Sequence, residues 1–346
     1  MSESSKLDIK SLDLPELTEW VVSAGLPKFR AGQIYKWLHQ NFVSSFSEMT
    51  NLPKALRQQL EESCEIKNCT VEKKLVSHID ATVKYLFRLC DGEMIESVVM
   101  KYKYGYSICV SSQVGCRMGC RFCASTVNGL KRNLYPSEIL SQIYAAQNDL
   151  NIRVSHIVLM GMGEPLDNYA HVIKFLKLVN DDNGIHISMR NISLSTCGIV
   201  PRMLDLMDLD LQLTLSVSLH APNDEIRGAT MPVNRKWNID EVLEACRKYA
   251  AKTSRRISFE YTLIDGVNDS EACAAELSSR LKGLLCHVNL IPVNEVSESG
   301  FQKSSSKNIE KFMKMLKKSG INATIRRTLG SDINASCGQL RRSMEN

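Results

Sequence analysis

Residues 115–123 read Gly-Cys-Arg-Met-Gly-Cys-Arg-Phe-Cys, so that Cys116, Cys120 and Cys123 form a CxxxCxxC run. Three closely spaced thiolates can hold three irons of a 4Fe–4S cluster. The sequence has no fourth cysteine at ferredoxin spacing, which leaves one iron open to another ligand. The run therefore predicts a metal centre that takes part in chemistry rather than one that only stores an electron.

Two simpler interpretations of the three cysteines remain as alternatives. A structural zinc ion takes four ligands, but no further cysteine or histidine stands nearby at finger or ribbon spacing. Three unrelated core cysteines would explain the residue type but not the spacing. We favour the cluster over both.

The composition is typical of an intracellular enzyme. The chain has 346 residues, of which 44% are hydrophobic and 23% are charged, and its net charge is +5. It shows no basic and apolar segment for secretion and no long uncharged stretch for a membrane span. We expect a cytoplasmic protein that does not enter a membrane.

The other cysteines and the basic residues carry weaker signals. In a large chain from a reducing compartment, scattered cysteines behave as small apolar residues. We expect buried or half-buried positions without chemistry for Cys64, Cys69, Cys90, Cys197, Cys246, Cys273 and Cys286. Basic residues gather toward the C-terminus and could suit a polyanion. They are Lys311, Lys314, Lys317, Lys318, Arg326, Arg327, Arg341 and Arg342.

The beginning of the chain has the pattern of a helical unit. Apolar residues recur at helical spacing around Leu17 and again around Ile34, and Pro53 is placed to open a third helix. We expect an N-terminal helical domain over residues 1–68.

The next segment changes to the period of a strand. Between residues 70 and 100, apolar side chains such as Val83 alternate with polar ones such as Lys84, and Asp91-Gly92 is a hairpin signal. We expect a small β-meander over residues 69–101.

Beyond Tyr106, short apolar runs alternate with amphipathic helical segments. This alternation predicts an α/β fold with a partial, six-unit parallel (βα)6 barrel over residues 102–331, followed by a loop and tail over 332–346. The six expected strands cover 108–110, 157–160, 192–194, 213–219, 257–263 and 288–291.

Polar residues stand at the carboxyl ends of these expected strands, where parallel barrels place their reactive groups. They lie in the segments Gly161 to Glu164, Ser195-Thr196 and Ser218 to His220, and at Asn294.

Several motifs together resemble one family over nearly the whole chain. The CxxxCxxC run, with Phe122 before its last cysteine, is similar to the signature of the radical S-adenosylmethionine superfamily. The wider set resembles the RlmN family, whose members methylate C2 of an adenosine in 23S rRNA and, in bacteria, of an anticodon-loop adenosine in tRNA. The motifs lie at 111–116, 161–165, 218–222, 286–292 and 335–340.

The resemblance implies two cofactors and two further thiols. A 4Fe–4S cluster on Cys116, Cys120 and Cys123 would bind S-adenosylmethionine and cleave it to a 5′-deoxyadenosyl radical, with two S-adenosylmethionine molecules used per turnover. Cys337 would first be methylated, because a thiolate is a nucleophile whereas adenine C2 is electron-poor. Cys109 would then attack the sulfur of Cys337, and the transient disulfide would free the methylated base.

The resemblance also implies the remaining roles. Glu96 matches the proposed proton acceptor, although a strand carboxylate is more often a surface residue. Gly163 and Glu164 match contacts to the amine of S-adenosylmethionine. Contacts to its ribose, adenine and carboxylate match Ser195, Ser218, Leu219, His220 and Asn294.

The implied partners are 23S rRNA, as a protein-poor precursor or fragment, and tRNA. A flavodoxin- or ferredoxin-type electron donor is also implied, and we expect a monomer. The helical N-terminal domain and the basic C-terminal residues are candidates for contact with RNA phosphates.

Two alternatives to C2 methylation stay open. The related Cfr enzymes use the same cysteines and cluster but methylate C8; they tend to carry alanine after the glutamate, where this chain has Pro165. An RNA-binding or iron-sulfur redox protein would not need Cys109 and Cys337.

Overall fold

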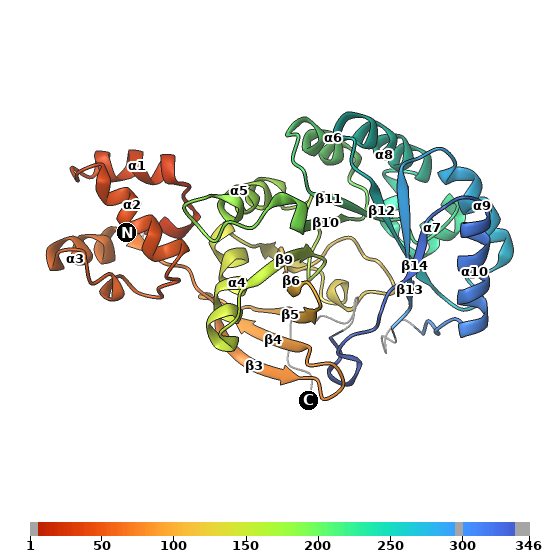
Figure 1. Ribbon diagram of the computed structural model, residues 1–346, viewed down its shortest axis with the longest axis horizontal. Coiled ribbons are helices and arrows are strands. Elements are labelled where there is room, and N and C mark those ends of the chain that lie inside the picture. The colour runs from red at the N-terminus through yellow and green to blue at the C-terminus, as the bar shows by residue number, and fades with distance from the viewer. Residues whose placement is uncertain (1–5, 295–299, 336–346) are drawn as a thin grey trace.

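A ten-stranded sheet forms the centre of the computed structural model, which describes residues 6–294 and 300–335 (Figure 1). Its strand order is β14-β13-β12-β11-β10-β9-β6-β5-β4-β3. Neighbours from β6 to β14 are parallel, whereas β3 to β6 pair antiparallel. The strands are β3 (Thr70–Val76), β4 (Val83–Arg88), β5 (Met94–Tyr102), β6 (Gly105–Cys109), β9 (Val154–Leu159), β10 (Ile192–Thr196), β11 (Thr214–Ser218), β12 (Ile257–Leu263), β13 (Cys286–Pro292) and β14 (Ala323–Ile325).

Helices connect the parallel strands, as in a βα barrel (Figure 1). In the part of the chain that the structure describes, no helix is both long and apolar enough to cross a membrane. The connecting helices are α4 (Pro136–Leu150), α5 (Tyr169–Asn180), α6 (Val200–Asp208), α7 (Asp224–Thr230), α8 (Ile239–Thr253), α9 (Glu271–Leu281) and α10 (Ser306–Lys318).

Helix α8 illustrates why these segments fold as they do. A capping box begins it, in which Asn238 accepts from the backbone N–H of Glu241 and the Glu241 carboxylate accepts from that of Asn238. Its apolar stripe, which includes Val242 and Cys246, is fully buried. The predicted amphipathic segment is therefore an outer helix of the barrel.

The predicted partial barrel is confirmed. The six predicted strands correspond to β6, β9, β10, β11, β12 and β13. A seventh parallel strand, β14, adds to β13 and was not predicted, because three residues are too few to show a period. A separate antiparallel pair, β7 (Gln113–Gly115) with β8 (Leu130–Asn133), also lies outside the prediction and encloses the cysteine run.

The N-terminal helices lie at one end of the molecule (Figure 1). They are α1 (Leu14–Ser23), α2 (Phe29–His39) and α3 (Lys54–Ser63), and Pro53 precedes the third as predicted. A short parallel pair, β1 (Leu7–Asp8) with β2 (Cys64–Glu65), closes this part of the chain on itself.

The predicted meander is the antiparallel edge of the main sheet, formed by β3, β4 and β5. Lys84 on β4 is only 8% exposed. Side chains alternate along a strand, so that of Lys84 lies on the face of the sheet opposite to that of its neighbour Val83. A buried lysine needs a partner, and the C-terminal segment and Glu96 provide contacts that the local pattern cannot show.

Candidate functional site

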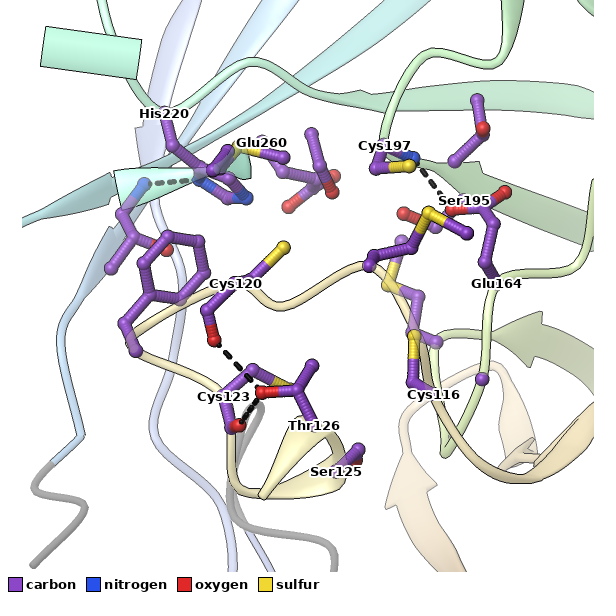
Figure 2. Close-up of a pocket in the computed structure, with 18 of the residues that line it drawn as sticks. Cys116, Cys120, Cys123, Ser125, Thr126, Glu164, Ser195, Cys197, His220 and Glu260 are labelled. Carbon is purple, nitrogen blue, oxygen red and sulfur yellow. Dashed lines mark hydrogen bonds between the residues drawn. The ribbon is translucent and has the colours of Figure 1, made fainter. Parts of the chain in front are cut away.

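A cavity lies at the carboxyl ends of the parallel strands β9 to β13, beside the cysteine run (Figure 2). Its empty space is about 930 Å³, counted out to the solvent at its mouth. We call it the cluster cavity. Its wall includes Cys116, Cys120, Cys123, Glu164, His220 and Glu260.

The β7–β8 pair positions the loop that carries the three cysteines. Gly115 has a positive φ of 78°, and a Cβ there would lie 1.9 Å from the carbonyl oxygen of Gly129. The Cys116 N–H donates to that same oxygen at 3.0 Å. The Thr126 hydroxyl closes the loop by donating to the carbonyls of Cys120 and Cys123, at 3.1 and 2.9 Å. Glycine at 115 is required by this close approach.

The three thiols face the cluster cavity, and those of Cys116 and Cys120 are poorly disposed to ionise alone (Figure 2). Burial raises the pKa of Cys116 to about 12. Burial also raises the pKa of Cys120 well above its usual value, and the neighbouring Cys123 and Cys116 add to the rise. Three thiolates at this place therefore need the positive charge of bound metal.

The geometry favours a cluster over a single ion. Over residues 6–294 and 300–335, no three histidine, cysteine, aspartate or glutamate side chains converge closely enough to hold one metal ion. A zinc site requires such convergence, whereas each cysteine of a 4Fe–4S cluster binds its own iron. The three cysteines fit the iron-sulfur group that their spacing predicts.

Glu164 is the buried carboxylate of the cluster cavity. It is 4% exposed and follows strand β9. Its oxygens accept hydrogen bonds from the backbone N–H groups of Cys197, at 2.7 Å, and Leu166, at 3.0 Å. Burial raises its pKa. A fixed carboxylate inside a cavity that also has an apolar wall suits the ammonium group of a ligand.

Gly163 allows the chain to pack closely beside Glu164. Its φ is +102°, and a Cβ would stand 2.6 Å from the Cβ of Gln113. Gln113 in turn accepts from the Glu164 N–H at 2.8 Å. The glycine and the glutamine therefore set the direction of the carboxylate.

His220 is held neutral with a defined tautomer. Its Nδ1 accepts from the Thr262 N–H at 2.9 Å, which leaves the ring proton on Nε2. Burial lowers the pKa of His220 to about 3, and the nearby Arg227 adds to the fall. The rings of Phe122 and His220 pack edge to face, with their centroids 4.9 Å apart. His220 thus offers an N–H donor rather than a charge.

The other predicted cofactor contacts divide into two groups. Ser195 on β10, Ser218 at the end of β11 and Asn294 after β13 all line the cluster cavity, together with Gly163. Leu219 is fully buried and is not among the described residues of that wall; its N–H donates to the carbonyl of Glu260 at 3.1 Å.

A second hollow adjoins the first and contains Cys109. We call it the Cys109 cavity. It shares Met160, Ile291, Asn294 and Arg326 with the cluster cavity. Cys109, at the end of β6, is 7% exposed and lies opposite Val98 of β5. The structure therefore places this thiol in a hollow that adjoins the cluster cavity.

The two other predicted catalytic residues are Glu96 and Cys337. Glu96 is 6% exposed, and Lys84 Nζ lies 2.9 Å from its Oε1. Glu96 is not among the described residues that line either hollow. Cys337 lies outside the described residues, but Ala335, two positions earlier, lines the Cys109 cavity.

Two residues of the cluster cavity wall, Glu260 and Arg326, were not predicted as site residues from the sequence. Glu260 is a buried carboxylate on β12, and Asn289 donates to it at 2.8 Å. A single charge within the apolar strand 257–263 could have indicated it. Arg326, expected among the basic surface residues, lines both hollows and lies 3.7 Å from Glu260.

Two expectations about the inert cysteines need correction. Cys90 is exposed rather than buried, because it follows β4 at a turn. Cys197 is buried as expected, yet it lines the cluster cavity, and its backbone holds Glu164. Strand-end geometry, which local sequence does not display, brought it there.

Comparison with known proteins agrees with this site. Residues 110–276 match the model of the radical SAM superfamily, and residues 7–66 match that of the ribosomal RNA large subunit methyltransferase N-terminal domain. The superfamily match and the fitting cysteines identify the cofactors as a 4Fe–4S cluster and S-adenosylmethionine.

Proteins similar to this one over almost its entire length are named probable dual-specificity RNA methyltransferase RlmN. One, from Lachnospira eligens, is 53% identical over 334 residues, covering 96% of this chain and 95% of its own. Another, from Alkaliphilus oremlandii, is 55% identical over 337 residues, covering 97% and 98%. A radical SAM methyltransferase structure from Sphaerobacter thermophilus superposes with a TM-score of 0.94 at 42% identity, covering 97% of this chain and 100% of its own. The chain therefore belongs to the RlmN family of radical SAM RNA methyltransferases.

Proposed function

We propose that the protein methylates C2 of an adenosine in 23S rRNA, and of an anticodon-loop adenosine in tRNA, through an S-methyl group on Cys337. One observation carries the proposal. The Cys109 cavity shares four lining residues with the cluster cavity and is lined by Ala335, two residues before Cys337. Two residues span at most about 7 Å, so the methyl-carrying thiol can work beside both Cys109 and the cofactors.

When bound, the cofactors supply one-electron chemistry that makes an unreactive carbon–hydrogen bond reactive. The chain supplies the rest. Glu164 holds the ammonium end of S-adenosylmethionine, and His220 offers its Nε2 proton to a neighbouring acceptor. The apolar wall of the Cys109 cavity, with Val98 and Met100, excludes water from the sulfur chemistry.

The thiol chemistry assigns different tasks to the two cysteines. Cys337 accepts the methyl group and joins its carbon to the adenine. Attack of the Cys109 thiolate on the Cys337 sulfur forms a disulfide and breaks the bond from that sulfur to carbon; the carbon keeps the electron pair of this bond and takes a proton to become the methyl group. Cellular thiols then reduce the disulfide. Glu96 takes the C2 proton in this proposal, on the same face of β5 as Val98.

Further partners remain predictions. A flavodoxin- or ferredoxin-type protein would deliver the electron, and the enzyme would act as a cytoplasmic monomer. The domain boundaries at 68, 101 and 331 also remain proposals. The helical N-terminal domain, which matches a ribosomal RNA methyltransferase model, is the first candidate for RNA contact.

The product distinguishes the proposed reaction from its alternatives. The holoenzyme, reconstituted without oxygen, is incubated with a short 23S rRNA fragment or with tRNA, and the digested nucleosides are measured by mass spectrometry. We expect 2-methyladenosine. A main product of 8-methyladenosine would identify Cfr-type specificity, and no product would leave only binding or redox roles.

Two cysteine variants test the intermediate. Cys337→Ala should keep its iron and make no product. Cys109→Ala should leave RNA joined to the protein, visible as a slow band on a denaturing gel. Cys90→Ala is the control, because this exposed thiol lies away from both hollows. Normal turnover by Cys337→Ala, or no joined RNA with Cys109→Ala, would contradict the proposed intermediate.

A further inference from the structure

Residues 330–335, which lead to Cys337, are held by a distant turn of the chain. This turn, Ser77 to Thr82, connects β3 to β4. The Ser77 hydroxyl and the His78 N–H donate to the two carboxylate oxygens of Asp332, at 2.7 and 2.9 Å. In the opposite direction, the Gly330 N–H donates to Asp80 at 2.9 Å. Figure 1 shows the blue C-terminal segment beside this orange turn.

The held segment is itself a compact turn. The Ala335 N–H donates to the Gly330 carbonyl at 3.0 Å, which closes it. Gly330 has a φ of +60°, and a Cβ there would lie 2.7 Å from the Cβ of Ala335 and 3.0 Å from a methyl of Thr82. The segment therefore fits against the β3–β4 turn in one shape.

Lys84 joins the same segment to the buried Glu96. Its ammonium lies 2.9 Å from the Glu96 carboxylate and donates to the Asn334 carbonyl at 3.1 Å. Both side chains of the ion pair are less than a tenth exposed. A buried ion pair contributes little net stability. It restricts the relative positions of its two side chains, because separating them would leave each charge buried without a partner. Lys84 thus ties Glu96 to a point three residues before Cys337.

Charge argues against RNA as the occupant of this turn. Asp80 and Asp332 both face the contact, and carboxylates repel phosphates. The hydrogen bonds from Ser77 and His78 lower the pKa of Asp332, so that it stays ionised at neutral pH. The arrangement suits a contact within the chain.

We propose that the β3–β4 turn and Lys84 form a clamp that positions Cys337 relative to Cys109 and Glu96. The clamp comprises Ser77, His78, Asp80 and Lys84 on one side and Gly330, Asp332 and Asn334 on the other. Lys84 and Asp332 are positioning residues, because neither is among the described residues that line the cluster cavity or the Cys109 cavity. The role in turnover rests on the proposed function, whereas the holding of the segment does not.

Asp332→Ala tests the clamp without disturbing the core, because Asp332 is exposed. Its matched control is Asp240→Ala, an exposed aspartate on α8 that pairs with Arg280. Holoenzymes are compared without oxygen by iron content, by kcat and KM for the rRNA fragment, and by the rate at which iodoacetamide alkylates Cys337, followed by peptide mass spectrometry.

We expect Asp332→Ala to keep its iron and its KM within about twofold, while kcat falls roughly ten- to hundredfold, as is usual for a displaced reacting group. Alkylation of Cys337 should become several times faster, and Asp240→Ala should match the wild type. Equal alkylation rates in Asp332→Ala and the wild type would overturn the clamp.

Lys84→Met tests the second contact and should also expose Cys337 to alkylation, with partial rescue in Lys84→Arg. If Lys84→Met does not fold, Asp332→Ala still decides. If the wild type made no methylated adenosine, the proposed function would fail while the alkylation comparison would still report on the clamp. Faster alkylation with unchanged kcat would overturn the positioning role and retain only a structural contact.

Discussion

The parallel strands β9 to β13 and the antiparallel strands β3 to β5 belong to one sheet, yet they contribute to the site differently. Parallel strands all end at the same edge, so Glu164, Ser195, Ser218 and Asn294 meet there although they are far apart in the chain. Antiparallel strands end at alternate edges of the sheet. Strand β5 therefore contributes side chains from its middle, Val98 and Met100, which line the Cys109 cavity.

In the proposed function, cofactor binding belongs to the parallel part and thiol chemistry to the border with the antiparallel part. The cluster cavity is built from strand ends, glycines and backbone N–H groups, which hold a ligand in one position. The antiparallel part instead contacts a second stretch of chain, 330–335, through the β3–β4 turn. Variants in the two parts should therefore fail in different ways.

The largest expected effect is the loss of the cluster. Cys120→Ala removes one of the three proposed iron ligands, so we expect iron to be lost and product formation to be abolished. Cys109→Ala, at the antiparallel border, should retain its iron. Iron analysis and the visible absorbance of anaerobic protein measure both. Equal loss of iron in the two variants would break the comparison.

An intermediate effect is expected at Gly163. Gly163→Ala would place an alanine at a φ of +102°, with its Cβ 2.6 Å from the Cβ of Gln113. The variant should therefore lower the free energy of unfolding by roughly 2–5 kcal/mol. Gly283→Ala is the control, because its φ is +76° with no atom within 4 Å of the added Cβ. It should cost only about 1 kcal/mol.

Urea unfolding of both variants measures this difference. The same variants should differ in S-adenosylmethionine affinity, because only Gly163 stands beside Glu164. Similar urea midpoints for the two would show that the close packing at the parallel strand ends does not matter.

The smallest effect is the pH dependence due to His220. Burial holds its pKa at about 3 in the folded protein, whereas the unfolded chain binds a proton below about pH 6.5. The unfolded state thus binds more protons between these values, and stability falls as the pH decreases through this window. From pH 7.5 to 5.5 His220 should contribute a loss of about 1 kcal/mol.

This contribution can be isolated with His220→Phe, whose urea unfolding is measured at the same two pH values. The wild type should lose about 1 kcal/mol more than the variant on acidification. An identical loss in both would show that His220 is not held neutral in the cluster cavity.

Much of the fold was predictable because its signals are local. Helical spacing, alternating apolar runs and Pro53 indicated helices and strands that the structure contains. Strand β14 and the β7–β8 pair were missed, because segments of three or four residues are too short to show a period.

Residues of the cavity wall could be predicted where the spacing of cysteines or a position at the end of a strand indicated them. The three cysteines, Glu164 and His220 all face the cluster cavity. Arg326 was expected on the surface, and Glu260 was missed, because their positions depend on each other and on strands joined only in the folded sheet. Leu219, a predicted cofactor contact, is fully buried and is not among the described residues of the wall.

The amino-acid sequence alone indicated the candidate iron ligands, the barrel class and the family, since cysteine spacing and apolar periodicity are properties of neighbouring residues. Only the tertiary structure decided that Cys109 lies beside the cluster cavity and that the β3–β4 turn holds the segment before Cys337. Contacts between residues about 250 positions apart arise from packing of the whole sheet.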